Sequence, residues 1–456
     1  MKMLPHTTLS ATSRTYNLHG NLKLTIDVQN NPYNLSPDNL FEMGVRINKK
    51  RQFLFISRLL GKHLPVDPSL SLGTGTVLAS MLMENEGLPA HPQLLDIIRM
   101  IDSGKPDRTL SFSSLKYRVK LPTNTVFIGF AETATGLGHA VFNHFDEAQY
   151  IHTTREEITN LSPSFVFEEE HSHATSHRVY ASENVLKKAE TIVLVDDEIT
   201  SGLTLSNLII SLNEKFPNKQ FKILSILDWR SVENINNFTD LMKQKGIHAE
   251  IISILSGQFT LHNTATINEE AIPCLQGQEV HVSLENGTTS QYTAPYFSEH
   301  AIYSTFTGRF GLTSENHAAM DNWIHKLLEK LTLDKDKPTL VIGIGENIYI
   351  PSRIALALGK YTKIQTTTRS PIFAKNEEHY PIKSKCKFIL PDSNDVEQYL
   401  YNVAAHEFEQ ILVVAESVKN KETWSPLLSY LQSKGSITWL SLTTPTDRGG
   451  IEDAKN

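Results

Sequence analysis

The sequence predicts an α/β fold: a parallel sheet with helices on both faces, followed by a second, degenerate α/β domain. From about residue 124, short apolar runs such as TVFIGF, TIVLVDD and FKILSILD alternate with amphipathic stretches such as LTLSNLIISLNEKF. The same alternation returns from residue 338. Strands that alternate with helices indicate a parallel sheet covered on both faces.

The two α/β regions also match each other in sequence. Three residues of each region stand 214 positions apart, namely Gly129, Glu132 and Arg155 against Gly343, Glu346 and Arg369. Further along, IVLVDDE at 192–198 matches ILVVAES at 411–417 with an offset of 219. Two copies are too few for a repeat array, so the pattern favours a duplicated domain. The alternative is that any two strand–turn–helix units resemble each other.

Length and composition bound the class of protein. A chain of 456 residues predicts two or three domains, and 40% hydrophobic with 20% charged residues is ordinary for a soluble protein. A net charge of -7 argues against bulk affinity for nucleic acid or membranes. The two cysteines form no CxxC pair, and no signal-peptide core or long apolar run occurs. We therefore expect a cytoplasmic protein without nucleic-acid or membrane partners.

The sequence also suggests elements and boundaries outside the α/β core. Residues 15–29 alternate like a strand or hairpin outside the main core, and Ser36-Pro37-Asp38 predicts the start of a helix that runs to Gly61. Four regions are expected: an N-terminal extension and hood at 1–99, a first α/β domain at 100–256, a linker or β segment at 257–312, and a C-terminal α/β domain at 313–456.

The most informative stretch is IVLVDDEITSGLTL at 192–205, where a buried strand ends in Asp196 and Asp197. A tight turn then enters a helix whose exposed N–H groups form an anion site, and Gly202 allows close approach of the backbone. The two carboxylates suit the hydroxyls of a sugar, directly or through Mg²⁺. The pattern predicts a site for a ribose 5-phosphate. The alternative is a capped helix after an acidic strand end.

This pattern resembles the phosphoribosyl-pyrophosphate (PRPP) motif of type I phosphoribosyltransferases. The resemblance implies that Asp196 and Asp197 bind the ribose hydroxyls, with Mg²⁺ carried by PRPP and no metal site of the protein's own. It implies a 5-phosphate loop of Thr200, Ser201, Gly202, Leu203 and Thr204. It implies a pyrophosphate site of Glu132, Thr133, Ala134, Thr135 and Arg155. The family usually has a lysine or arginine in that loop, whereas GFAETATGLG has none before His139.

Four further segments narrow the resemblance: residues 51–66, GFAETATGLG, EEHSHATSH and Thr368-Arg369-Ser370-Pro371. Together they look like a bacterial family that joins an orotate-phosphoribosyltransferase-like domain to a C-terminal domain named after T-R-S-P. That family occurs in tellurium-resistance-type operons, with a proposed role in making a nucleoside-like metabolite. The resemblance implies phosphoribosyl transfer from PRPP to a base, or the reverse reaction of pyrophosphate with a nucleotide-like substrate, and it allows a homodimer.

Residues 156–190 occupy the slot of the loop that closes over the substrates in type I transferases. Glu170, His171 and His173 are the catalytic candidates there, since histidines titrate near neutral pH and donate to phosphate when protonated. A metal site that includes His177 and a solvated turn are the alternatives. Arg58, Lys62 and His63 are candidates for an acceptor pocket, or else a solvated basic helix end.

The C-terminal copy has lost the acidic pair, because Ala415-Glu416 stands where Asp196-Asp197 stood. It is therefore not expected to bind PRPP in the same way. Gly345, Glu346, Arg353 and residues 366–370 either form a second ligand site or are a structural relic. Two other functions stay open for the whole chain: a non-catalytic PRPP or nucleotide sensor, and a metal-dependent hydrolase that uses His171, His173 and His177.

Overall fold

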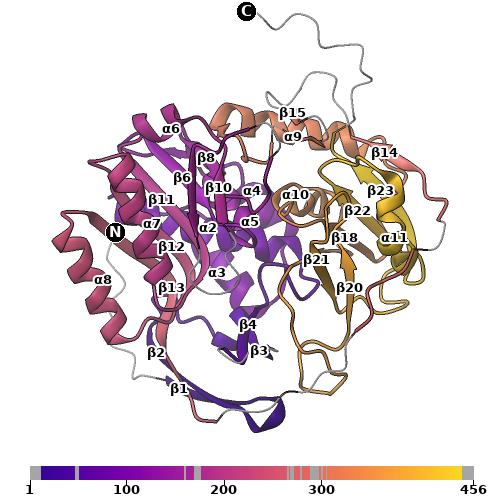
Figure 1. Ribbon diagram of the computed structural model, residues 1–456, viewed down its shortest axis with the longest axis horizontal. Helices are drawn as coiled ribbons and strands as arrows, with labels where there is room; N and C mark the ends of the chain where they lie inside the picture. Colours follow the sequence, from indigo (N-terminus) through magenta and orange to yellow (C-terminus); the bar gives the residue numbers. More distant parts are fainter. Residues whose placement is uncertain are drawn as a thin grey trace, which may run out of the picture.

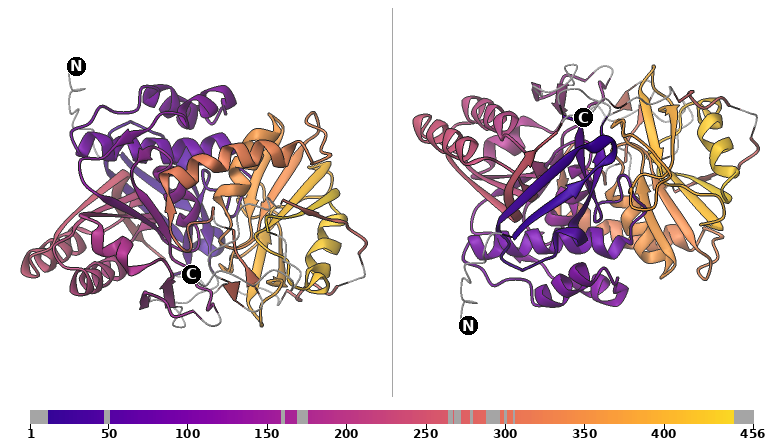
Figure 2. Two further views of the ribbon diagram at one scale, coloured as in Figure 1. Left: turned by 90° about the horizontal axis from the view of Figure 1, so that it is seen from above. Right: turned by 90° about the horizontal axis from the view of Figure 1, so that it is seen from below.

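A computed structural model of the chain describes residues 12–46, 51–158, 161–168, 176–263, 267, 272–277, 280–287, 297–298, 301–304 and 306–443. It contains two large β-sheets that lie side by side, with helices packed between and around them (Figure 1). The views from above and below show the same arrangement (Figure 2). The α/β class predicted from the sequence is confirmed. Among the described residues, no helix is long and apolar enough to cross a membrane.

The first unit is built on an eight-stranded sheet of order β1-β2-β13-β12-β11-β6-β8-β17. Its central strands β13, β12, β11, β6 and β8 run parallel, and β1, β2 and β17 add antiparallel pairs. The strands are β1 Thr12–Asn17, β2 Lys23–Asn30, β6 Thr125–Gly129, β8 Gln149–His152, β11 Thr191–Ile199, β12 Gln220–Asp228, β13 His248–Leu261 and β17 Leu312–Thr313.

The second unit is built on a five-stranded parallel sheet of order β14-β23-β22-β18-β19. Its strands are β14 Leu284–Asn286, β18 Thr339–Gly343, β19 Thr362–Thr366, β22 Gln410–Ala415 and β23 Ser436–Ser441. Short strands lie outside both sheets: β5 Val119–Lys120 pairs with β7 Phe145–Asp146, and β15 Phe297–Ser298 pairs with β16 Ala301–Ile302.

The two sheets repeat one another in strand order and in register. The order β12-β11-β6-β8 of the first unit recurs as β23-β22-β18-β19 in the second. Val126 pairs with Gln149 in the first sheet, and Leu340 pairs with Lys363 in the second, each shifted by the same 214 positions. This agreement is what a duplicated domain predicts, and similarity between unrelated strand–turn–helix units would not fix the register.

In each unit a β-hairpin follows the equivalent strand, which is β8 in the first unit and β19 in the second. The hairpin of the first unit pairs β9 Phe165–Glu168 with β10 Ser176–Val179, and that of the second pairs β20 Lys385–Ile389 with β21 Glu397–Tyr401. Thr154 forms a bridge to Arg178 of the first hairpin, and Thr368 forms the matching bridge to Tyr399 of the second.

Eleven α-helices lie within the described residues: α1 Pro37–Leu40, α2 Pro68–Asn85, α3 Leu94–Ser103, α4 Arg108–Ser114, α5 Ala134–Phe142, α6 Glu183–Lys188, α7 Leu203–Lys215, α8 Val232–Gln244, α9 Ser314–Leu328, α10 Tyr349–Leu358 and α11 Ser425–Gln432. Helix α2 is buried on nearly all sides and contacts both α5 and α10. A Cβ atom on Gly75 would lie 2.5 Å from the Cβ of Ala140, so this glycine permits the close approach of α2 to α5.

The helix predicted from Pro37 to Gly61 is wrong. It ends after one turn at Leu40, and the chain then forms an antiparallel hairpin of β3 Phe41–Val45 and β4 Phe53–Ser57. Aromatic side chains explain the difference, because the rings of Phe41 and Phe55 pack edge to face at 5.0 Å and both contact Trp229.

The hairpin predicted at 15–29 exists as β1 and β2, but it does not lie outside the main core. Strand β2 pairs with β13 and so extends the first sheet. Leu24 and Ile26 of β2 are fully buried in the main hydrophobic cluster, because alternate side chains of a strand point to the same face.

Candidate functional site

The carboxyl ends of β6, β8 and β11 meet at one edge of the first sheet, since the three strands are parallel neighbours. Ligands of open α/β sheets bind in the crevice outside these strand ends. Strand β11 carries Asp196 and Asp197 just past Val195, which pairs with the last residue of β6, Gly129. The sequence-predicted ribose and pyrophosphate residues are therefore brought to the same edge.

Asp196 and Asp197 are both half-buried, and the backbone N–H of Asp197 donates to Oδ1 of Asp196 at 2.9 Å. The next residue, Glu198, forms an ion pair with Arg51 at 2.5 Å, and the Arg51 guanidinium lies 5.0 Å from the ring centre of Phe53. Arg51 and Glu198 were not predicted as partners, because the β3–β4 hairpin that presents Arg51 was read as a helix. Glu198, the third acid of this strand end, is thus paired with an arginine.

The predicted 5-phosphate loop turns sharply into α7. Gly202 has φ 76°, and α7 begins at the next residue, Leu203. The first turn of an α-helix leaves its N–H groups without intrahelical acceptors, so they are suited to bind an anion. A Cβ on Gly202 would lie 3.0 Å from Cδ of Arg230, whose guanidinium is held by Asp228 at 2.9 and 2.7 Å. The glycine is therefore required both by its φ angle and by this contact.

The predicted pyrophosphate loop after β6 is bound by residues of both units. The N–H of Ala131 donates to Oγ1 of Thr153 at 2.8 Å, and the peptide bond between Ala131 and Glu132 is cis. The carboxylate of Glu132 is buried and accepts hydrogen bonds from the hydroxyl of Thr368 at 2.8 Å and the N–H of Arg369 at 3.3 Å. The T-R-S-P segment of the second unit thus binds the loop of the first.

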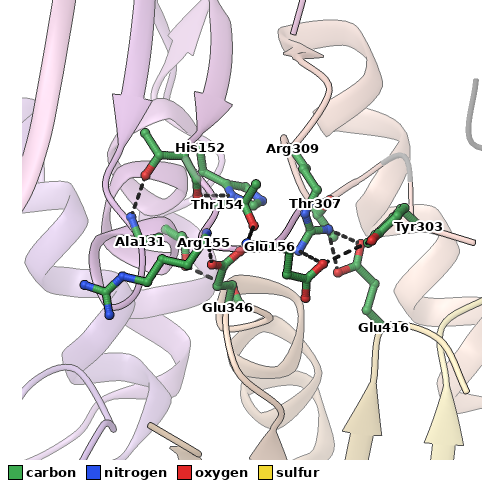
Figure 3. A network of polar contacts seen from close by, with 12 residues as sticks. Ala131, His152, Thr154, Arg155, Glu156, Tyr303, Thr307, Arg309, Glu346 and Glu416 are labelled. Atoms are coloured by element: carbon green, nitrogen blue, oxygen red, sulfur yellow. Dashed lines mark hydrogen bonds and ion pairs between the residues drawn. The ribbon is translucent and has the colours of Figure 1, made fainter. Parts of the chain in front are cut away.

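The equivalent loop of the second unit is bound in the same way by the first unit. Its loop acid, Glu346, accepts a hydrogen bond from the backbone N–H of Arg155 at 2.8 Å (Figure 3). The hydroxyl of Thr135 donates to the backbone carbonyl oxygen of Glu346 at 2.9 Å. Arg155 was predicted to reach pyrophosphate in the first unit, and it is among the residues that line a cavity at the carboxyl edge of the second sheet. Its role in pyrophosphate binding stays a prediction.

Arg309 links the two units through ion pairs with Glu156 of the first and with Glu346 and Glu416 of the second. It is buried and donates to both carboxylate oxygens of Glu416 at 2.8 and 2.7 Å and to Glu346 at 3.5 Å (Figure 3). The guanidinium also lies 4.6 Å from the ring centre of Tyr303. Burial raises the pKa of Glu416, and Arg309 opposes that shift. Glu416 stands 219 positions after Asp197, so the carboxylate retained in the second copy is bound by arginine.

A cavity of about 550 Å³ opens at the carboxyl edge of the second sheet. Arg155, Arg309, Arg369, Glu346, Glu416 and Asp392 are among the residues that line it. Arg353, which was grouped with Glu346 in the sequence, lies elsewhere on α10 and binds Asp321 and the hydroxyl of Tyr349. The cavity occupies the position in the second unit that the ribose-phosphate site is predicted to occupy in the first.

Asp392, in the turn between β20 and β21, fills one corner of this cavity. Its Oδ1 accepts from the N–H of Asn420 at 2.8 Å and the hydroxyl of Thr423 at 3.1 Å. Its Oδ2 accepts from the N–H of Lys419 at 3.0 Å and the indole N–H of Trp424 at 3.1 Å. Residues 419–424 include the 3₁₀ turn Lys421–Trp424 and stand 219 positions after residues 200–205. The second copy of the anion loop therefore holds a carboxylate.

The three candidates for an acceptor pocket do not gather at one place. Arg58 is exposed, pairs with Glu42 at 2.9 Å and lines a separate cavity of about 530 Å³. His63 is fully buried with its ring 5.7 Å from that of Tyr401, and burial lowers its pKa. Lys62, which directly precedes His63 in the sequence, is half-buried.

The predicted catalytic residues Glu170, His171 and His173 lie outside the described residues. His177 lies within β10, where it is buried, accepts or donates a hydrogen bond with Thr153 at 3.0 Å and stacks on Phe167. The described part of the chain contains no cluster of three or more His, Cys, Asp or Glu side chains arranged to hold a metal ion. His177 thus contacts Thr153 after β8, whose hydroxyl in turn accepts from Ala131 in the loop after β6.

The parallel sheet, the two carboxylates at the end of β11 and the glycine turn into α7 are the features that the sequence predicted for a phosphoribosyltransferase-type site. In agreement, residues 40–258 match the family model described as phosphoribosyl transferase. Residues 306–431 match the model described as the TRSP domain C-terminal to that domain. The chain therefore joins a phosphoribosyltransferase-type region to a TRSP-type region, as the T-R-S-P signature predicted.

Three solved structures are similar over part of the chain. Adenine phosphoribosyl transferase from Trypanosoma brucei, in complex with AMP, pyrophosphate and ribose-5-phosphate, is 14% identical, with 36% of this chain and 69% of that chain covered and a TM-score of 0.22. For APRTase from Giardia lamblia with 9-deazaadenine these values are 15%, 29%, 71% and 0.19. For orotate phosphoribosyltransferase from Aeropyrum pernix they are 12%, 30%, 59% and 0.16. No curated protein matches the chain.

Proposed function

We propose that the first unit transfers a phosphoribosyl group between PRPP and a base or nucleotide-like acceptor, or runs the reverse reaction with pyrophosphate. Asp196 and Asp197 bind the ribose hydroxyls, and the loop at 200–204 binds the 5-phosphate. The two carboxylates are hard oxygen ligands that suit Mg²⁺, which would arrive with PRPP and neutralise charge on the departing pyrophosphate.

One observation carries the proposal beyond the sequence motif. In the second unit, the loop equivalent to 200–204 binds the carboxylate of Asp392 through the N–H groups of two successive residues and the hydroxyl of Thr423. The equivalent groups in the first unit are the N–H groups of Thr200 and Ser201 and the hydroxyl of Thr204. This support is independent of the motif, because it comes from an anion that the duplicated loop binds.

The remaining roles are proposed from the contacts of Glu132 and from the residues predicted in the sequence. Glu132 is occupied by Thr368 and Arg369, so we propose that it fixes the shape of the pyrophosphate loop while the backbone of 133–135 faces the ligand. Transfer passes through an oxocarbenium-like sugar, and groups that act only on this developing charge raise the rate. Arg155 and the histidines His171 and His173, with Glu170, are the proposed groups that act on the leaving pyrophosphate.

The alternative is a PRPP or nucleotide sensor with the same fold. It is favoured by the loop after β6, which has no lysine or arginine before His139 and whose acid is bound to the second unit. Retention of both Asp196 and Asp197 favours the enzyme. Release of pyrophosphate on addition of an acceptor base separates the two functions. The resemblance to proteins of tellurium-resistance-type operons makes a nucleoside-like metabolite the product class that we propose.

Calorimetric titration of PRPP with Mg²⁺ tests the proposal. We expect micromolar binding to the wild-type protein and a loss of about 100-fold or more in Asp196→Asn/Asp197→Asn, because two hydrogen-bonded carboxylates are removed. Asp240→Asn, an exposed change on α8, is the matched control and retains full affinity. Absence of PRPP binding in the folded wild-type protein contradicts the proposal.

A further inference from the structure

At the position equivalent to the predicted 5-phosphate loop of the first unit, the second unit has a turn whose donors are bound by a side chain of the same unit. Its loop at 419–424 presents two backbone N–H groups, a hydroxyl and an indole N–H to one point, and the carboxylate of Asp392 lies at that point with four contacts of 2.8 to 3.1 Å. Donors that converge in this way form an anion site. The anion comes from the chain itself.

We propose that Asp392 is a permanent internal ligand of an anion site at 419–424, the position in the second unit that is equivalent to residues 200–205 of the first. The site takes a carboxylate or phosphate anion, and a tethered carboxylate excludes a phosphorylated ligand by its high effective concentration. The cavity beside it is therefore closed to ribose phosphates at this corner. This inference does not depend on the proposed function of the first unit.

A chain of contacts also connects Asp392 to the first unit. Asp392 anchors the turn between β20 and β21, and β21 pairs with the T-R-S-P segment through Tyr399, whose N–H donates to the carbonyl of Thr368 at 2.7 Å. Thr368 in turn donates to Glu132 in the loop after β6. Asp392 is thus connected through β21 and Thr368 to the loop after β6, and the second unit acts as a positioning scaffold for the first.

Removal of the carboxylate should open the site to an external anion. Asp392 has φ 60°, so Asp392→Gly removes the side chain without strain in the backbone. Asp395→Gly is the matched control, because Asp395 lies in the same turn with φ 60° and is exposed. We expect a fall in Tm of about 4 °C or more in Asp392→Gly and a smaller change in the control.

Inorganic phosphate is the probe, compared with chloride at equal ionic strength. We expect calorimetry to find one more phosphate per chain in Asp392→Gly than in the wild type, and saturating phosphate to restore part of the lost Tm. Asp392→Asn keeps the shape of the side chain, so it should lose stability without gaining the phosphate site. Equal phosphate binding in wild type and Asp392→Gly overturns the proposal, as does an Asp392→Gly protein that phosphate does not stabilise.

Discussion

Glu132 and Glu346 occupy the same position in two copies of one loop, and each carboxylate is bound by the opposite copy. Glu132 accepts a hydrogen bond from the hydroxyl of Thr368 at 2.8 Å, and Glu346 accepts one from the N–H of Arg155 at 2.8 Å. Thr368 follows β19 of the second unit, and Arg155 follows β8 of the first unit. The two loops are therefore linked reciprocally, and neither can shift without breaking a contact in the other unit.

This link predicts energetic coupling between Glu132 and Thr368. Glu132→Ala and Thr368→Val each remove one side of a buried, charge-assisted hydrogen bond, so each should lower the free energy of unfolding. The double variant should lose about 1–2 kcal/mol less than the sum of the two single losses. Denaturant unfolding of the four proteins measures the coupling. Thr368→Ser keeps the hydroxyl and should show little loss, whereas strictly additive losses would contradict the contact.

Gly202 should be needed for ligand binding as well as for backbone geometry. Gly202→Ala places a Cβ 3.0 Å from Arg230 at a φ of 76°, and we expect a loss of about 1 kcal/mol in stability together with weaker PRPP binding. Gly246→Ala is the control, since Gly246 has φ 66° with nothing within 4 Å of the added Cβ. It should lose similar stability and keep PRPP affinity. Titration of PRPP into both variants decides the point, and equal affinity would refute the role of the turn.

Arg309 should be essential for stability, because its removal leaves the buried carboxylate of Glu416 without its arginine partner. We expect Arg309→Met to lower the free energy of unfolding by about 3–5 kcal/mol. Burial raises the pKa of Glu416. At low pH the folded variant therefore holds Glu416 in its neutral form at little cost. As pH rises, the unfolded chain ionises this carboxyl more readily than the folded chain does, and the folded state loses stability. The loss should therefore be larger at pH 8 than at pH 5.

Adding Glu416→Gln to Arg309→Met gives the control for that pH dependence. The double variant removes the buried charge, so it should recover part of the stability and lose the extra penalty at pH 8. Thermal unfolding at both pH values measures these differences. A penalty that is the same at pH 5 and pH 8 in Arg309→Met would show that Glu416 is not the group responsible.

Buried histidines should make the protein sensitive to acid. Burial lowers the pKa of His144 and of His152 to about 3, below the value of about 6.5 in an unfolded chain. As pH falls below 6.5 the unfolded chain takes up protons that the folded chain refuses, so stability present above 6.5 is lost down to about pH 3. Each such histidine contributes about 1.4 kcal/mol per pH unit in that window.

His144→Asn tests this acid sensitivity. The slope of the unfolding free energy against pH between 6 and 5 should fall by about 1.4 kcal/mol per unit relative to the wild type. His248 is exposed, and His248→Asn serves as the control. An unchanged slope in the His144 variant would be the contrary result.

The fold class, the duplication and the acidic strand end could be predicted because each depends on a local pattern. The strand of IVLVDD, the glycine turn and the offsets of 214 and 219 are all visible within short windows of sequence. Residues 41–57 were mistaken because a short apolar run fits a helix or a strand equally well, and only packing against Trp229 decides.

The ion pair of Arg309 with Glu416 and the contact of Asp392 with the loop at 419–424 had no local signal. Arg309 and Glu416 are 107 positions apart, and Asp392 contacts its loop from the β20–β21 hairpin. One signal was available for the second case: the known offset of 219 placed a copy of the phosphate loop at 419–424, which pointed to an anion there.

Helix α2 has a consequence for how the whole chain unfolds. It is enclosed by both units, and the main hydrophobic cluster runs without a break from Phe127 and Val193 of the first sheet to Val341 and Leu412 of the second. Because the two units share this interior, neither unit should unfold in a separate thermal transition. Heat should therefore give one calorimetric peak, and damage to either sheet should be felt as loss of the entire protein.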